Sequence, residues 1–247
     1  MMTRVLVLGA RGRVGSLVVA GVKDAEDLEL CAEVDLGDDL VTAIETGRPE
    51  VAVDFTAPDA VFENTRTLLA QKVHAVIGTS GLTPGQLDEL GALAEANGVA
   101  VLFAPNFAVG AVFMMRFAEE AARHFPWVKV IERHHEHKLD APSGTANATA
   151  RRLAAAREEA VAPKNETETA PGARGGQVDG IPVHSIRLPG SVAHQEVLFG
   201  GPGETLSIRH DTIDRAVFVP GVLLGVRGVQ ARTGLLLGLE TVLWPDS

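Results

Sequence analysis

Short apolar runs alternate with helix-like stretches through the first hundred residues of the chain. Residues 4–8 are apolar after their first position, which is typical of a strand buried on both faces of a sheet. A glycine-rich turn and a helical stretch follow before the next apolar run. Repetition of this unit predicts a parallel, doubly wound α/β sheet. We expect its strands at residues 4–8, 28–34, 51–56, 73–81 and 99–103, and its helices at 16–22, 58–71 and 83–97.

The pattern changes after residue 108. Residues 163–176 are polar and rich in proline, glycine, glutamate and threonine, which predicts a mobile loop. Short links join the three strands that follow this loop, and such links fit antiparallel hairpins. We therefore expect a Rossmann-type domain formed by residues 1–107 and 216–247, with an α+β domain inserted at 108–215. The expected helices are 109–124, 146–160 and 216–227, and the strands are 128–134, 181–188, 196–199, 204–210 and 234–240.

The turn after the first strand carries glycines at G-x-x-G-x-x-G spacing. One glycine allows the tight turn, another lets the backbone approach a pyrophosphate, and the third lets helix and strand pack closely. The helix N-terminus then offers unpaired N–H groups to the phosphates. Because this turn lies between a strand and a helix, it predicts a dinucleotide site. The residues expected to contact the dinucleotide are Gly9, Ala10, Arg11, Gly12, Arg13 and Val14.

The second strand ends in acidic residues that bear on the choice of nucleotide. Asp35 follows Gly15 by 20 residues (35 − 15), and either Glu33 or Asp35 could accept a hydrogen bond from the adenosine ribose. Arg11 and Arg13 could instead bind a 2′-phosphate. NADH and NADPH therefore both remain candidates at this point.

Two further small-residue segments follow later strands. In doubly wound sheets ligands bind beyond the carboxyl ends of the strands, so both segments are candidates for contacting the ribose and the nicotinamide. The first comprises Gly78, Thr79 and Ser80, and the second comprises Ala104, Pro105, Asn106 and Phe107.

A dense polar cluster at residues 132–145 has the sequence ERHHEHKLDAPSGT and holds three of the eight histidines. If this strand stayed extended, His134 and Lys138 would lie about 13 Å apart at ~3.3 Å per residue, whereas a turn after His135 would let them converge. In either case the cluster offers titratable donors and a fixed cation, which suits general acid catalysis and carboxylate binding. Gly144 and Thr145, at the next helix start, offer N–H groups and a hydroxyl to a second anion.

Composition narrows the possible functions. The chain has 22 basic and 32 acidic residues, a net charge of −10, and a single cysteine. Such a charge opposes non-specific binding to nucleic acid or to an anionic membrane. One cysteine allows neither an intramolecular disulfide nor a thiolate metal site. No segment reaches 18 consecutive apolar residues, and we expect a soluble cytoplasmic protein.

Two rival functions also fit parts of the pattern. His134, His135 and His137 with a carboxylate could bind zinc in a metal-dependent hydrolase. Adjacent histidines on a strand point to opposite faces, so three of them rarely meet at one ion, and we expect no metal. The second rival is a module that senses a dinucleotide without catalysis. Metal analysis tests the first, and turnover of NADH tests the second.

The cluster resembles the signature of the dihydrodipicolinate reductase family, also called the 4-hydroxy-tetrahydrodipicolinate reductases, of the diaminopimelate route to lysine. The shared core is H-H-x-x-K-x-D-x-P-S-G-T, and the resemblance extends to residues 9–15, 78–81, 104–107 and 194–200. It implies NAD(P)H-dependent reduction of a cyclic dicarboxylate imine with loss of water. The nearest alternative is another NAD(P)-dependent reductase of a small dicarboxylate imine.

The resemblance also implies roles for individual residues. His134 is implied to be the proton donor and acceptor, Lys138 a proton donor, and His135 a substrate contact. Gly144 and Thr145 are implied to hold a substrate carboxylate. The cofactor is implied to lie along residues 9–14, with Asp35 near its ribose and the segments 78–80 and 104–107 further along. A homotetramer built through the sheets of the inserted domain is implied as well. Ser80 replaces the second threonine of the family's G-T-T-G turn and keeps its hydroxyl.

Overall fold

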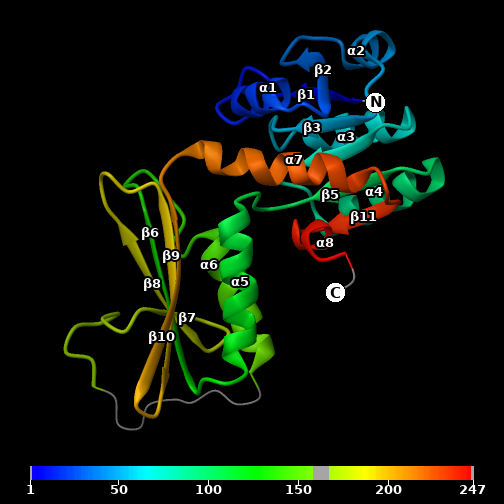
Figure 1. Cartoon of the computed structure of the whole chain (residues 1–247). Coiled ribbons are helices and arrows are strands. Elements are labelled where there is room, and N and C mark those ends of the chain that lie inside the picture. The colour runs from blue at the N-terminus through cyan, green and yellow to red at the C-terminus, as the bar shows by residue number, and fades with distance from the viewer. Residues whose placement is uncertain (1, 158–166, 246–247) are drawn as a thin grey trace. The chain divides into compact units, whose positions relative to one another are not determined.

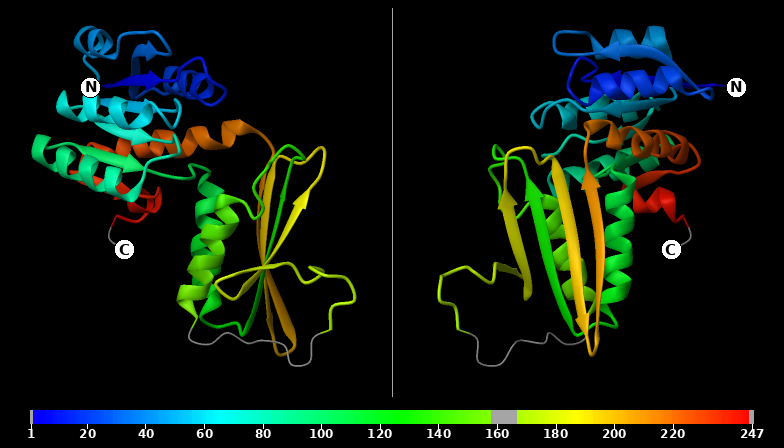
Figure 2. Two further views of the ribbon diagram at one scale, coloured as in Figure 1. Left: turned by 180° about the vertical axis from the view of Figure 1, so that it is seen from behind. Right: turned by 60° about the vertical axis from the view of Figure 1, so that its left-hand side comes forward.

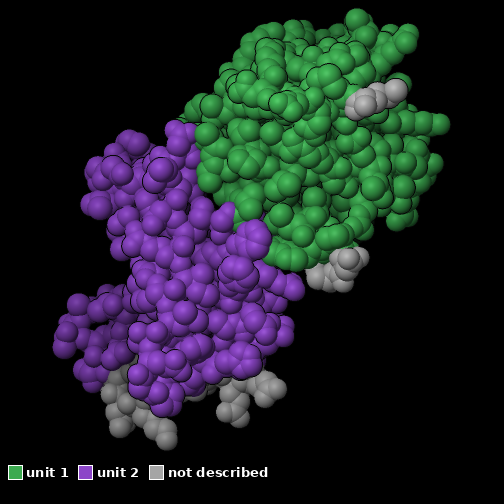
Figure 3. All heavy atoms as spheres, viewed as in Figure 1, with its two compact units in different colours: residues 1–109, 215–247 green, residues 110–214 purple. Residues whose placement is uncertain are grey.

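A computed structural model describes residues 2–157 and 167–245 of the chain. These residues form two compact units (Figure 3). Unit 1 comprises Met1–Val109 and Arg215–Ser247, and unit 2 comprises Gly110–Asp214. No helix in the described ranges is both long and apolar enough to cross a membrane.

Unit 1 is built on a six-stranded sheet in the order β11-β5-β4-β3-β1-β2, and every pair in it is parallel. Helices flank this sheet (Figure 1). The sheet and its crossovers confirm the expected doubly wound α/β class. The strands are β1 (Thr3–Leu8), β2 (Leu28–Val34), β3 (Val51–Asp54), β4 (His74–Ile77), β5 (Ala100–Phe103) and β11 (Gly234–Leu237). The helices are α1 (Gly15–Asp24), α2 (Leu40–Gly47), α3 (Val61–Ala70), α4 (Pro84–Asn97), α7 (Phe218–Val229) and α8 (Glu240–Leu243).

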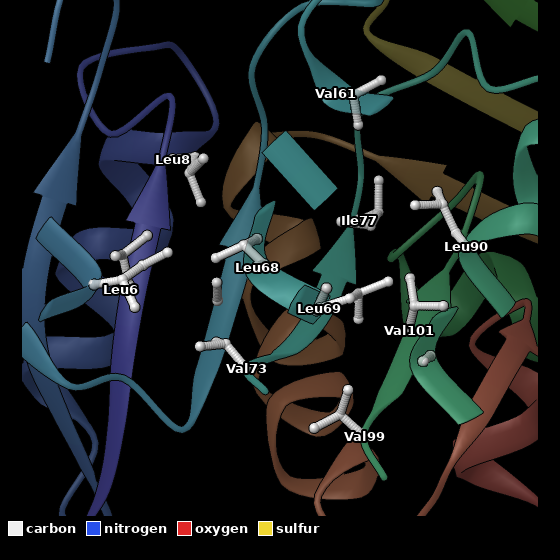
Figure 4. Close-up of a cluster of buried hydrophobic side chains, with 14 of the residues drawn as sticks. Leu6, Leu8, Val61, Leu68, Leu69, Val73, Ile77, Leu90, Val99 and Val101 are labelled. Atoms are coloured by element: carbon white, nitrogen blue, oxygen red, sulfur yellow. The ribbon is translucent and has the colours of Figure 1, made fainter. Parts of the chain in front are cut away.

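The core of unit 1 explains why its strands are nearly all apolar. The central strands are covered on both faces, and every residue of β3 is buried. The side chains drawn in Figure 4 come from several of these strands and from the helices that pack on them. Helix α4 begins at a capping box in which Thr83 and Gln86 bond to each other's backbone, as its Thr-Pro start indicates. Burial on both faces is what the continuous apolar runs predict.

Several elements of unit 1 differ from expectation at their ends. Helix α2 was not expected, although Asp39 caps it by accepting from the backbone N–H groups of Val41 and Thr42. Helix α3 begins at Val61, three residues later than the expected start at residue 58, because residues 58–60 form a turn. The last strand ends at Leu237, and residues 240–243 form α8 instead of extending it. Short helices and turns leave too few residues for a periodic signal.

The described residues of unit 2 form a five-stranded mixed sheet in the order β10-β9-β6-β8-β7 and two long helices. Figures 1 and 2 show α5 and α6 on one face of this sheet. Alanines of both helices pack there against apolar side chains from the sheet. The opposite face carries the alternate residues of each strand. The elements are α5 (Val109–Ala122), β6 (Trp127–His134), α6 (Gly144–Ala156), β7 (Gly176–Val178), β8 (Ile181–Arg187), β9 (Ala193–Gly201) and β10 (Glu204–Thr212).

One expected hairpin in unit 2 is wrong. β9 and β10 form an antiparallel hairpin, but β8 and β9 do not pair with each other. β6 lies between them, parallel to β8 and antiparallel to β9. The link at residues 188–192 is long enough to cross the end of β6, since it must span only two strand spacings of about 4.8 Å. Its first N–H, on Leu188, donates to the carbonyl of His134 at 3.0 Å.

The ends of two further expected elements lie beside undescribed residues. Helix α6 begins at Gly144, two residues earlier than expected, and ends at Ala156, because Arg157 has an extended backbone. Residues 158–160, where the expected helix would have ended, lie outside the described residues, as do residues 163–166 of the expected loop.

Candidate active site

The candidate nucleotide site lies at the carboxyl edge of the sheet in unit 1. In the pairing register Leu8 lies beside Asp54, Asp54 beside Ile77, and Ile77 beside Phe103. The four strands β1, β3, β4 and β5 therefore end in one row. The chain passes from β1 to β2 on one side and then to β3 on the other, which creates the switch point where such sheets bind ligands.

The glycine loop after β1 is held by backbone contacts. Gly9 has a φ of 72°, and a Cβ there would lie 2.4 Å from the carbonyl oxygen of Phe55. A Cβ on Gly15 would lie 2.0 Å from the carbonyl oxygen of Gly9. Helix α1 can therefore lie this close to the loop only because residue 15 is a glycine. Gly12 closes the turn by donating its N–H to Gly9 at 2.9 Å. Helix α1 has no side-chain cap at its start. The N–H groups of Ser16 and Leu17 donate to the carbonyls of Gly12 and Val14 at 3.0 Å, whereas those of Val14 and Gly15 have no partner among the described residues and are available to an anion.

Asp35 and the two arginines lie at the rim of this loop. The carboxylate of Asp35 accepts from the backbone N–H of Arg11 at 2.7 Å and from that of Leu36 at 2.8 Å, and these bonds lower the pKa of Asp35. The guanidinium of Arg11 bonds to Asp38 at 2.9 Å. Arg13 is exposed. Both the acidic and the basic groups expected to read the ribose are thus present at this rim.

A buried carboxylate, Asp54, organises the next loop, although sequence reasoning assigned it no role. It is fully buried at the end of β3, and its Oδ1 accepts from the hydroxyls of Thr56 and Thr79, each at 2.7 Å. Asn64 donates to its Oδ2 at 3.2 Å. Thr79 therefore anchors the segment 78–80 through Asp54, while Ser80 is exposed. The one feature of the sequence that points to Asp54 is its position, because it is an acidic residue at the end of an otherwise apolar strand.

The segment after β5 is fixed in a similar way. Asn106 accepts from the N–H of Ala108 at 2.9 Å, which closes a tight turn. Phe107 is buried, and its ring lies 5.9 Å from that of Phe55 between centroids. Pro105 is exposed and Ala104 is buried. The structure thus gathers the expected cofactor residues of unit 1 at one sheet edge.

In unit 2 the chain turns directly after β6. The N–H of Lys138 donates to the carbonyl of His135 at 3.2 Å, which decides between the extended and the turned arrangement in favour of the turn. The ammonium of Lys138 lies 2.7 Å from Asp140 and lowers the pKa of that carboxyl. His137 is 85% exposed and lies 3.5 Å from Glu136. Among the described residues no three His, Cys, Asp or Glu side chains gather as a possible metal site.

Glu132 is the buried centre of this cluster. Its Oε2 lies 2.6 Å from Nδ1 of His134, and the guanidinium of Arg187 donates to both carboxylate oxygens at 2.9 Å. The N–H of Ser143 donates to Oε1 at 3.3 Å. Burial would raise the pKa of Glu132, but the hydrogen bonds from His134, Arg187 and Ser185 outweigh burial and lower the pKa to about 2. One carboxylate therefore ties the strand end to the start of helix α6.

The start of helix α6 is open to a ligand. Ser143 is its N-cap residue and accepts from the N–H of Ala146 at 3.2 Å. Gly144 is exposed, and a Cβ on it would meet nothing within 4 Å. The N–H groups of Gly144 and Thr145 and the hydroxyl of Thr145 have no partner in the described parts of the chain. These are the groups expected to hold a carboxylate.

Sequence reasoning missed Arg187 and gave Glu132 no role. Glu132 lies two positions before His134 on the same strand and so shares its face, which is a usable signal. Arg187 lies beside His134 in the parallel register of β6 and β8. No sequence pattern indicates that pairing, because the two residues are 53 positions apart (187 − 134).

We expect acid to weaken unit 2 through Glu132. Its folded pKa of about 2 lies below the ordinary value of 4.5, so this stabilisation is complete above about pH 4.5 and is lost as the pH falls through about 2. The shift corresponds to roughly 3 kcal/mol. Urea unfolding between about pH 5 and pH 2, followed by Trp127 fluorescence in a Trp244→Phe background, measures it. Glu132→Gln should remove this part of the pH dependence, and an unchanged pH slope in that variant would contradict the assignment.

Comparison with known proteins identifies the family. The protein-family model described as "Dihydrodipicolinate reductase, N-terminus" matches residues 3–107. The family model described as "Dihydrodipicolinate reductase, C-terminus" matches residues 110–243. Relatives named 4-hydroxy-tetrahydrodipicolinate reductase include one from Nocardia farcinica, 57% identical over 98% of this chain and 99% of the relative. Another, from Mycolicibacterium gilvum, is 55% identical over 97% of this chain and 98% of the relative.

Solved structures agree with this result. The dipicolinate-bound dihydrodipicolinate reductase from Paenisporosarcina sp. TG-14 matches with a TM-score of 0.91 and 43% identity, over 98% of this chain and 99% of that one. An amine dehydrogenase from Mycobacterium smegmatis, 14% identical with a TM-score of 0.66, shares the fold alone. With both halves of the chain matched by family models and relatives aligned over nearly its whole length, the protein belongs to the dihydrodipicolinate reductase family.

Proposed function

We propose that the protein catalyses the NAD(P)H-dependent reduction of 4-hydroxy-tetrahydrodipicolinate to tetrahydrodipicolinate, with loss of water, in lysine biosynthesis through diaminopimelate. The observation that carries this proposal is the network around Glu132. This carboxylate bonds to His134 and to the N–H of Ser143, and Arg187 connects it to the carbonyl of Lys138 at 3.2 Å. One hydrogen-bond network therefore connects the proposed proton-transfer residue His134, the backbone of the cation Lys138 and the open start of helix α6.

Each part of this network suits a dicarboxylate that must be protonated. The open N–H groups of Gly144 and Thr145, with the Thr145 hydroxyl, would bind one carboxylate at the helix N-terminus. Lys138 supplies positive charge, and both Lys138 and His135 supply hydrogen-bond donors to the rest of the ring. His134 and Lys138 exchange the proton that balances the hydride and the departing water. The Paenisporosarcina relative was solved with dipicolinate, a planar dicarboxylate of this kind.

The residues of unit 1 fit a nicotinamide dinucleotide. Helix α1 has no side-chain cap at its start, and Gly15 has no side chain where the helix lies against the loop 9–14. A pyrophosphate therefore has room to bind beside this loop. The segments 78–80 and 104–107, at the same edge, would contact the ribose and the nicotinamide. When bound, the reduced nicotinamide supplies the hydride. Asp35 suits the ribose diol of NADH, and Arg11 and Arg13 suit the 2′-phosphate of NADPH, so we propose that both nucleotides serve.

A direct assay tests this function. Freshly generated 4-hydroxy-tetrahydrodipicolinate should cause loss of NADH or NADPH absorbance at a rate proportional to the protein concentration. Tetrahydrodipicolinate should form in equal amount, as measured by mass spectrometry. Absence of absorbance loss with both nucleotides would rule the proposal out. Turnover after exhaustive treatment with a chelator should match that of the untreated protein, and a loss of activity there would favour the metal-dependent alternative.

We also propose a cytoplasmic homotetramer assembled through the sheets of unit 2. One face of that sheet is covered by α5 and α6 (Figure 2). The other face carries the alternate side chains of β6, β8 and β9. Apolar side chains on this open face include Trp127 and Ile186, which are 41% and 43% exposed. Large exposed apolar side chains on a sheet face that no described element covers are typical of a subunit interface.

Analytical ultracentrifugation tests the assembly. The wild-type chain should sediment as four copies, and Leu198→Asp should sediment as a smaller species. Leu198 lies at the middle of the open face, beside Lys129 and Ser207 in the sheet register, so the new carboxylate can pair with Lys129 within the isolated chain. Val41→Asp, on exposed α2 of unit 1, is the matched control and should leave the mass unchanged. A monomeric wild-type chain would disprove the assembly.

A further inference from the structure

We propose that Glu132 and Arg187 are positioning residues for the proposed reaction: Glu132 holds His134 in the tautomer with its proton on Nδ1, and Arg187 holds the turn that carries Lys138. The inference rests on the proposed function, because it concerns the proton that His134 exchanges with substrate. Neither residue needs to touch the substrate for this role.

The contacts of Glu132 fix the proton of His134. Glu132 is fully buried, and with a pKa of about 2 it is a carboxylate at neutral pH. A carboxylate only accepts hydrogen bonds, so Nδ1 of His134, 2.6 Å away, must be the donor. Neutral His134 then carries no proton on Nε2. That nitrogen has no partner among the described residues, which leaves it free to take a proton from a ligand or to return one.

Arg187 connects the strand end to the turn. It lies beside His134 in the sheet, and it donates through Nη1 and Nη2 to the two oxygens of Glu132. Its Nε donates to the carbonyl of Lys138 at 3.2 Å, and its Nη2 also donates to the carbonyl of Asp140. The planar guanidinium thus fixes three separate points of the chain at once. A lysine could keep the charge but not this geometry.

Glu132→Gln should reverse the tautomer. The Oε1 position faces two obligatory donors, Arg187 Nη2 and the Ser143 N–H, whereas the Oε2 position beside His134 faces only one, Arg187 Nη1. The amide oxygen is therefore favoured at the Oε1 position. The amide NH₂ then takes the Oε2 position beside His134 and donates to Nδ1. A neutral imidazole that accepts at Nδ1 carries its proton on Nε2, which is the wrong nitrogen for taking a proton from substrate.

The first test is a measurement on the wild-type protein and needs no variant to fold. Two-dimensional ¹H–¹⁵N spectra of the full chain at alkaline pH report which nitrogen of each imidazole is protonated, and the His134 signal is assigned by its loss in His134→Gln. We expect the proton on Nδ1 in the wild type and on Nε2 in Glu132→Gln. An Nε2-protonated wild-type His134 would overturn the proposal, as would an unchanged tautomer in Glu132→Gln.

The second test is kinetic and uses a matched control. Glu132→Gln should lower kcat about 100-fold while the KM for NADH changes by less than about twofold. Glu136→Gln removes one carboxylate from the same turn, where Glu136 pairs with the exposed His137, and should keep normal kinetics. Arg187→Lys should keep the Nδ1 tautomer and raise the KM for the dicarboxylate about tenfold, because the turn loses its fixed carbonyl contacts. Normal kcat in Glu132→Gln, or normal KM in Arg187→Lys, would contradict the corresponding role.

The two kinds of failure are distinguishable. If the wild-type protein does not reduce 4-hydroxy-tetrahydrodipicolinate, the proposed function fails, and the NMR result still stands as a property of His134. If the wild-type protein is active and Glu132→Gln is equally active, the function stands and the positioning role fails.

Discussion

His134→Ala is expected to lower kcat about 1,000-fold, since general acid–base groups contribute about 10²- to 10⁴-fold to rate. The imidazole of His134 bonds through Nδ1 to the buried carboxylate of Glu132 at 2.6 Å. Because the proposed nucleotide-binding residues belong to unit 1 and His134 belongs to unit 2, the Kd for NADH should stay within about twofold of the wild-type value. Single-turnover kinetics and NADH fluorescence titration measure the two quantities.

The same turn supplies a matched control for this prediction. His137 is 85% exposed and pairs with Glu136, so His137→Ala removes an imidazole three positions from His134 without altering the hydrogen bonds of Glu132. It should retain wild-type kcat. Near-normal turnover in His134→Ala would show that the proton-transfer role lies elsewhere.

Gly15→Ala is expected to abolish measurable NADH binding and to destabilise unit 1 by about 3 kcal/mol or more, as overpacking does when backbone must move. The new Cβ would lie 2.0 Å from the carbonyl oxygen of Gly9 and 3.2 Å from Cα of Ala10. Both are backbone atoms, so neither contact can be relieved by a side-chain rotation. The loop and the start of helix α1 must separate, and these two segments form the proposed phosphate site.

Gly85→Ala provides the comparison for this second prediction. Gly85 lies in the first turn of α4, where a Cβ meets nothing within 4 Å. Alanine there should leave NADH binding unchanged and add a few tenths to about 1 kcal/mol of stability, because alanine favours helix. Urea unfolding followed by Trp244 fluorescence in a Trp127→Phe background measures unit 1. Wild-type NADH affinity in Gly15→Ala would contradict the close helix–loop packing.

The parts of the site that are contiguous in sequence were predictable. The glycine loop, Asp35 and the segments 78–80 and 104–107 all follow strands that apolar runs identify, so the parallel sheet places them at one edge. The cluster 132–145 contains a strand end, a turn and a helix start in 14 residues (145 − 132 + 1). Its members cannot be far apart, whatever the rest of the fold.

Pairing between distant strands was not predictable in the same way. The expectation that β8 and β9 form a hairpin was wrong because a five-residue link suits either neighbouring strands or strands one position apart. The inserted strand, β6, brings Arg187 beside His134 and makes β9 its antiparallel neighbour. Local sequence preference does not distinguish these arrangements, since the same strands can satisfy their backbone hydrogen bonds in both.

The sequence by itself predicted most of the elements in their order and the glycine loop, because burial on both faces and close backbone approach restrict residue types locally. The residues proposed to exchange protons and bind carboxylate came from its resemblance to the family. Only the tertiary structure decided that the chain turns after His135, and that Glu132 is a buried carboxylate shared by His134, Arg187 and Ser143. Those facts depend on which strand lies beside β6, because a buried charge is stable only where the fold brings it a partner.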